Sequence, residues 1–130
     1  MPGRIGPKMS ADAFEQVVRD VVSTIPKPLQ DRLDNVEILI ADWPTRAELR
    51  EAGVADGYTL YGLYTGVPLT ERTSSYGMVL PDRITIYRGP LVDACETEDE
   101  LREEIRGTVI HEFAHFFGLS DDDLRRLGVY

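Results

Sequence analysis

The chain has 130 residues, a length that suits a single domain with one core. Its 42% hydrophobic and 28% charged residues are typical of a globular protein and exclude a chain that is disordered throughout. The 23 acidic and 14 basic residues give a formal net charge of −9, which repels phosphate backbones and anionic lipids. We therefore expect neither nucleic acid nor a membrane as a partner. The oligomeric state, a monomer included, stays open.

The single cysteine, Cys95, cannot form an internal disulfide, and this favours a reducing cytoplasm as the location. Asp93 and Glu96 flank it and no histidine or lysine is near in sequence to activate it, so we interpret Cys95 as a small buried hydrophobe. Residues 1–9 include two prolines and two glycines and have no apolar stretch of the kind that a signal peptide needs. They are predicted to form a flexible tail before a domain spanning residues 10–130.

The first half of the chain predicts a helix, a strand and a short second helix. Ser10 can cap the first helix and Pro26 would stop it. Its apolar residues recur at helical spacing along one stripe: Phe14, Val17, Val18, Val21, Val22 and Ile25. Residues 36–41 are rich in β-branched side chains and indicate a strand, whereas the capping-box pattern at residues 45–48 predicts a helix that ends near Gly53.

Two more strands and two helices follow. Residues 58–64 indicate a strand and residues 66–77 a loop. Residues 83–88 indicate another strand, which Pro81 and Pro90 on either side would place at a sheet edge. A second capping box at residues 97–100 opens a helix of about five turns to Phe117, with Leu101, Ile105, Val109 and Phe116 as its apolar stripe. Gly118 is typical of a left-handed helix end, and Ser120 can cap a last helix through Leu127. Together these elements predict a single α+β domain.

The motif HExxH stands late in the long helix, at His111, Glu112 and His115. Two histidines four residues apart project from one side of a helix and can share one metal ion. Zinc in such a site lowers the pKa of a bound water and polarises a carbonyl, and Glu112 beside it can act as the general base. The sequence therefore predicts one Zn2+ per chain, with His111 and His115 as ligands.

Other functions are weaker interpretations of the same residues. The two histidines could be polar residues at the rim of an apolar stripe, but that does not explain their spacing around Glu112. A serine or cysteine hydrolase would need a further histidine, and the chain has only two. A metal-stabilised interaction domain that has lost its activity remains the main alternative.

Three segments resemble the small bacterial zincin-like metallopeptidases: residues 62–69 (GLYTGVPL), 81–91 (PDRITIYRGPL) and 109–121 (VIHEFAHFFGLSD). The resemblance implies a minimal zincin-like domain, a short mixed sheet with the HExxH helix packed beneath its edge strand. It also implies a zinc peptidase, whose partner would be a peptide or protein substrate.

A hydrolytic zinc site needs three protein ligands and an open position, and the helix supplies only two. The downstream candidates are Asp121, Asp122 and Asp123, which also suit the acidic first turn of a helix. A sharp turn at Gly118 would bring a residue three positions later back beside the histidines. The spacing HExxHxxGxxD is similar to the metzincin pattern, which implies Asp121 as the third ligand. No methionine follows Asp121, so the Met-turn of that clan is absent, and no glutamate follows Glu112 to serve as a gluzincin ligand.

We thus expect a zinc metallopeptidase in which Glu112 takes a proton from water and passes it to the leaving amine. The substrate backbone is expected to pair with the strand at residues 83–88. The candidate oxyanion donors, each more easily explained as a packed or solvent-facing residue, are Tyr64, Tyr76, Tyr87, Arg72 and Arg88.

Overall fold

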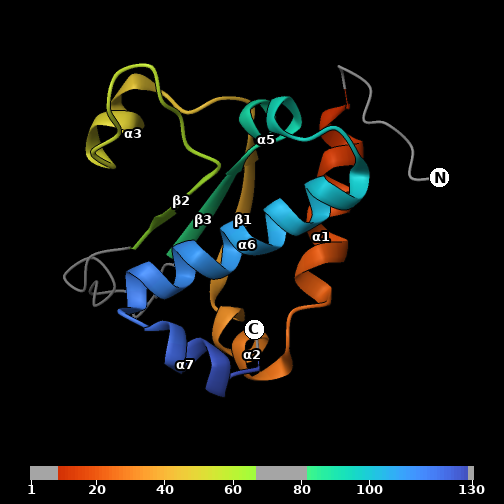
Figure 1. Cartoon of the computed structure of the whole chain (residues 1–130), viewed down its shortest axis with the longest axis vertical. Helices are drawn as coiled ribbons and strands as arrows, with labels where there is room; N and C mark the ends of the chain where they lie inside the picture. The colour runs from red at the N-terminus through yellow and green to blue at the C-terminus, as the bar shows by residue number, and fades with distance from the viewer. Residues whose placement is uncertain (1–8, 67–81, 129–130) are drawn as a thin grey trace, which may run out of the picture.

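The computed structural model describes residues 9–66 and 82–128. In chain order the elements are α1 (Ala11–Ser23), α2 (Lys27–Leu33), β1 (Val36–Ala41), α3 (Arg46–Glu51), β2 (Gly62–Thr65), β3 (Asp82–Tyr87), α5 (Arg88–Ala94), α6 (Glu98–Phe117) and α7 (Asp121–Arg126). They form the predicted α+β domain (Figure 1). In the part of the chain that is described, no helix is both long and apolar enough to cross a membrane.

Among the described residues the sheet is mixed and has three strands, in the order β1-β3-β2. Strand β3 pairs in parallel with β1 and antiparallel with β2, so it lies in the centre. The prediction of an edge strand at this position is therefore wrong. Pro90 falls in the first turn of α5, where a missing N–H costs no helical hydrogen bond, and so it does not affect the ladder. Pro81 lies outside the described residues.

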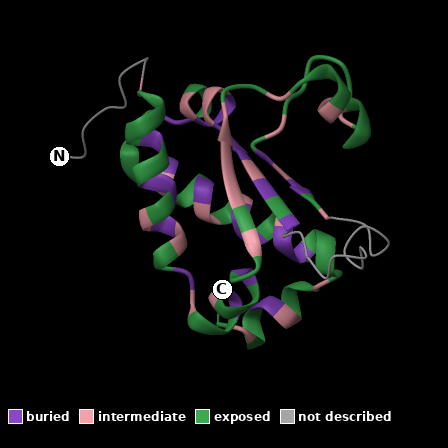
Figure 2. Cartoon of the chain, turned by 180° about the vertical axis from the view of Figure 1, so that it is seen from behind, coloured by how far each residue is buried: buried purple, intermediate pink, exposed green. Residues whose placement is uncertain are grey.

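Helices α1 and α6 contact each other, and α6 crosses one face of the sheet (Figure 1). The core lies between these layers, with Ile84 and Ile86 of β3 fully buried against them. The predicted stripe of α1 is confirmed: Phe14, Val17, Val18, Val21 and Ile25 are buried and Val22 packs on the core from its margin. From behind, most of β1 is only half-buried, so the helices cover one face of the sheet better than the other (Figure 2).

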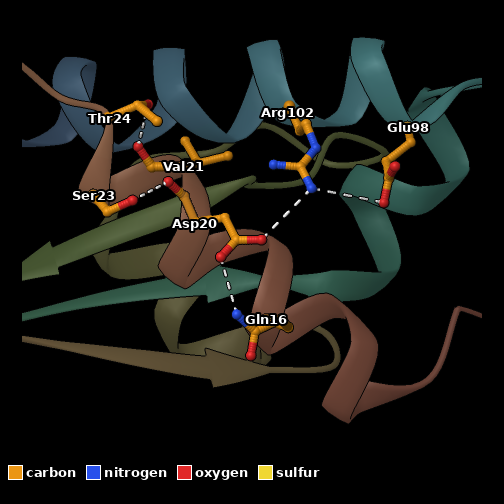
Figure 3. Close-up of polar contacts among 7 residues, drawn as sticks. All are labelled: Gln16, Asp20, Val21, Ser23, Thr24, Glu98 and Arg102. Atoms are coloured by element: carbon orange, nitrogen blue, oxygen red, sulfur yellow. Dashed lines mark hydrogen bonds and ion pairs between the residues drawn. The ribbon is translucent and has the colours of Figure 1, made fainter.

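Polar contacts tie α6 to α1 along their exposed margin (Figure 3). The guanidinium of Arg102 on α6 lies 3.7 Å from the carboxylate of Asp20 on α1 and 3.9 Å from that of Glu98. Asp20 also accepts a hydrogen bond of 2.9 Å from the Gln16 amide. Of these contacts, the Arg102–Asp20 pair joins the two helices, and partly exposed pairs of this kind add little stability.

Helix ends follow the local signals closely. Both halves of the capping box form at Thr45 and Glu48 of α3, and a further one forms at Ser120 of α7. At the start of α6 the Thr97 hydroxyl accepts from the Glu100 N–H, but the Glu100 carboxylate accepts from the Glu96 N–H, so only half of that predicted box forms. Gly118 ends α6 with a φ of 65°, the left-handed conformation predicted for it.

The sequence interpretation did not predict α2 and α5. Pro26, interpreted as the stop of the first helix, follows the end of α1 and is also the N-cap of α2, and Pro90, interpreted as a residue beyond a strand end, lies inside α5. Strand β2 is shorter than the predicted strand over residues 58–64. The predicted loop lies, apart from Gly66, outside the described residues.

The remaining local predictions concern the tail and the cysteine. Residues 1–8 of the predicted tail lie outside the described part of the chain. Met9, its last residue, packs on the core, and its carbonyl accepts a hydrogen bond from Arg88. Cys95 is buried, as predicted, and burial raises the pKa of its thiol.

Candidate metal centre

One face of helix α6 packs on the core and another face is exposed. Phe113 and Ala114 are buried between the two histidines in sequence, whereas His111 and His115 are exposed. Because residues four apart stand one turn above another, both imidazoles lie on the same exposed side. Neither imidazole has a hydrogen bond or ion pair with any residue that the structure describes, so their ring nitrogens are available to a metal ion.

The apolar stripe of α6 differs from the prediction at one position. Leu101, Ile105 and Val109 are fully buried as expected, but Phe116 is 45% exposed and Phe113 takes the core position instead. Phe113 follows Val109 by four residues and so continues the buried stripe. The Phe116 ring stacks at 4.1 Å on the ring of Tyr64, between α6 and strand β2.

Glu112 points toward strand β2. Its Oε1 accepts a hydrogen bond of 3.1 Å from the backbone N–H of Tyr64. The Tyr64 ring packs against Phe113, Phe116 and Phe117, and its hydroxyl donates to the Asp82 carboxylate at 2.7 Å. Strand β2, which donates the hydrogen bond to Glu112, is thus itself packed against phenylalanine rings of α6.

Asp121 is the first residue of α7, within its acidic first turn and exposed. Within residues 9–66 and 82–128, no three His, Cys, Asp or Glu side chains lie close enough together to hold a metal ion. The structure therefore brings His111, Glu112 and His115 together on one helix, but does not assemble Asp121 with them. The exposed imidazole pair fits zinc by ligand type, because neutral imidazole is a preferred zinc ligand, and Asp121 stays a prediction for the third position.

The candidate oxyanion donors that the structure describes have other contacts. The Tyr87 hydroxyl donates to the Glu48 carboxylate at 2.7 Å, and Arg88 pairs with Asp42 at 2.7 Å. The Tyr64 hydroxyl donates its hydrogen bond to the Asp82 carboxylate. Arg72 and Tyr76 lie outside the described residues. Tyr64 and Tyr87 are therefore better explained as packed residues than as oxyanion donors. Arg88 links Asp42, just after β1, to the Met9 carbonyl.

A hollow of about 600 Å3 opens beside the motif, and the sequence interpretation did not identify it. Its walls are residues 58–62, before and at the start of β2, and one side of α6, where His111 and Glu112 contribute to it. Gly107 in the middle of α6 was the available signal, because glycine is a poor residue for a helix interior.

The Tyr87 phenol gives a testable pH dependence. Burial, and then its hydrogen bond to the Glu48 carboxylate, raise its pKa well above the ordinary value of 10.0. Above pH 10 the unfolded chain releases this proton while the folded chain keeps it, so stability falls as pH rises. We expect the contribution of this group to make the free energy of unfolding fall with a slope that steepens above pH 10 toward a limit of about 1.4 kcal/mol per pH unit. Urea unfolding from pH 8 to pH 11 measures the slope. In Tyr87→Phe that contribution should vanish, and an unchanged slope would contradict the assignment.

Comparison with known proteins agrees with this architecture. Residues 33–129, most of the chain, match the family described as zincin-like metallopeptidase. The chain belongs to that family, and its α+β fold is a single zincin-like domain. A solved structure, that of a conserved hypothetical protein from Thermus thermophilus, is similar with a TM-score of 0.54 and 20% identity, over 84% of this chain and 94% of that chain. At this identity the likeness shows the fold alone. No curated protein matches the chain.

Proposed function

We propose that the protein is a zinc-dependent hydrolase of peptide or amide bonds. One observation carries the proposal: two exposed imidazoles without partners among the described residues stand one turn apart on α6, with Glu112 between them aimed at strand β2. Membership of the zincin-like metallopeptidase family supports the same chemistry.

In this proposal His111 and His115 hold the metal from the helix and Asp121 completes the protein ligands. Bound zinc would lower the pKa of a water molecule and would polarise the substrate carbonyl as a Lewis acid. Glu112 takes the proton released when the water oxygen bonds to the carbonyl carbon, and delivers it to the nitrogen as the C–N bond breaks. With Oε1 held by the Tyr64 N–H, Oε2 is the oxygen available for that proton.

In this proposal the substrate backbone pairs with strand β2 and not, as predicted, with strand β3. Strand β3 is paired on both sides, so it has no free edge for a peptide. Strand β2 has a partner strand on one side only among the described residues, and it is the strand that contacts Glu112. An extended peptide alongside β2 would place its backbone next to the motif, a common way to hold a peptide at a sheet edge.

The proposal is tested by metal analysis followed by peptide-library digestion, with and without a chelator. Cleavage that is lost with chelator and restored by added zinc supports it. Full zinc loading without cleavage of any library member would favour the alternative, a metal-stabilised interaction domain without activity. One observation speaks for that alternative: the described residues hold no third ligand close to the histidines, and hydrolytic zinc sites use three.

The Asp121 ligand assignment has its own test. Asp121→Ala should weaken zinc affinity at least about 10-fold, since loss even of supporting contacts around a metal costs that much. Asp122→Ala is the matched control, because Asp122 lies in the same exposed turn and pairs with Arg125 at 3.1 Å. Asp123 is a poorer control, because its carboxylate caps α7. Chelator competition that gives equal zinc affinities for the Asp121 and Asp122 variants would remove Asp121 from the site.

A further inference from the structure

The hollow beside the motif has the chemistry of a side-chain pocket. Its α6 side consists of Glu104, Gly107, Thr108, His111 and Glu112. The first four stand at i, i+3, i+4 and i+7, so they form one stripe that runs along the helix away from the histidines. The hollow is therefore continuous with the proposed reaction centre.

Gly107 keeps the middle of this stripe open. A Cβ built at Gly107 would meet no atom within 4 Å, so no close packing explains the glycine. Alanine would suit the helix better. The absent side chain leaves space in the hollow. At Gly62, by contrast, a Cβ would lie 2.6 Å from the Thr108 side chain, which shows that the opposite wall closes tightly onto the helix.

The far end of the stripe carries an acidic group with no partner among the described residues. The Glu104 carboxylate has no hydrogen bond or ion pair with any residue of that part of the chain, and Glu104 is exposed. The facing wall holds Tyr58, 73% exposed, and Tyr61, 36% exposed. A carboxylate together with exposed aromatic rings is a favourable environment for an organic cation, through ion pairing and attraction to the ring faces.

We propose that this hollow binds the lysine or arginine side chain of a substrate residue next to the cleaved bond. Glu104 pairs with the cation, and Tyr58 and Tyr61 flank it. Glu104 stands seven positions before His111, about 10 Å along the helix axis, a span that favours long side chains over short ones. The net charge of −9 also favours basic peptides. This specificity rests on the proposed peptidase function.

Binding is measured separately from cleavage. The probes are two fluorescently labelled, end-blocked hexapeptides of alanine and glycine, one with a single arginine and one with citrulline, its uncharged analogue, at that position. Both are titrated by fluorescence anisotropy against zinc-loaded Glu112→Gln, which should not cleave them. We expect the arginine peptide to bind at least about fivefold more tightly. Glu104→Gln, added to the same background, should abolish that preference, and Gly107→Leu should weaken binding of the arginine peptide by filling the hollow.

The matched control is Glu103→Gln, which removes a neighbouring exposed carboxylate that does not line the hollow and should leave the preference intact. Equal binding of the two peptides, no detectable binding of the arginine peptide, or a preference that survives Glu104→Gln would each overturn the proposal. A wild-type protein that cleaves peptides without this preference would leave the hydrolase standing while the pocket assignment fails. A Glu104-dependent preference without any cleavage would support the pocket and count against the hydrolase.

Discussion

Purified protein should contain close to one zinc ion per chain, and His111→Ala or His115→Ala should remove it. Both side chains are exposed and have no partner among the described residues, so their loss should cost the fold little. Each supplies one of only two helical ligands, however, and a single remaining imidazole does not hold zinc tightly. Elemental analysis after gel filtration measures the content, and circular dichroism checks that α6 remains helical.

Glu103→Ala is the control for these variants, because it also truncates an exposed residue of α6 but leaves the motif unchanged. It should retain wild-type zinc. If the double variant with alanine at both histidines still contains one zinc per chain, the metal lies elsewhere and the candidate centre is wrong. If the wild type binds no zinc even when refolded with excess metal, the candidate centre is also wrong.

Glu112→Gln should reduce peptide hydrolysis at least about 100-fold while zinc content stays at the wild-type level. Glutamine keeps the size and a carbonyl oxygen that can accept from the Tyr64 N–H, but its amide takes up no proton at neutral pH. The fold should therefore be as stable as the wild type, so a lost rate would reflect chemistry. Steady-state kinetics on a cleaved library peptide, with zinc analysis of the same samples, measures both quantities.

Glu112→Ala separates the two roles of this side chain. It removes the base and also the acceptor for the partly buried Tyr64 N–H, so it should lose activity and about 1 kcal/mol of stability. Urea unfolding of the two variants provides the comparison. Hydrolysis by Glu112→Gln at the wild-type rate would exclude Glu112 as the general base. Equal stability of the alanine and glutamine variants would mean that the strand contact contributes nothing to the folded state.

Signals that act within a few residues predicted the structure well. The caps at Thr45 and Ser120 and the left-handed turn at Gly118 depend on hydrogen bonds and backbone sterics inside one turn, and each forms as expected. The HExxH pair is equally local, because helix geometry alone places His111 and His115 on one side.

Besides the short helices α2 and α5, the predictions that failed depend on contacts between distant segments. The central place of β3 follows from pairing with β1 and β2, which the prolines beyond its ends could not reveal. Phe113 rather than Phe116 enters the core because of how α6 crosses the sheet, and spacing from Val109 allowed both. The hollow near Glu104 forms where residues 58–62 face α6. Gly107 is a local signal on the helix, but no local pattern predicts which segment lies opposite it.

The group that orients Glu112 belongs to the main chain. Every amino acid except proline carries a backbone N–H, so nearly any substitution at position 64 would keep a donor for the carboxylate, provided the path of β2 is unchanged. The identity of Tyr64 is instead fixed by its ring, which packs on the phenylalanines of α6, and by its hydroxyl on Asp82. In a saturation-mutagenesis experiment, position 64 would then behave as a packing site that prefers tyrosine, because phenylalanine keeps the ring but removes the hydroxyl donor of the buried Asp82 carboxylate. The role of the backbone N–H of residue 64 in orienting Glu112 would be visible only in the proline variant, which lacks that N–H.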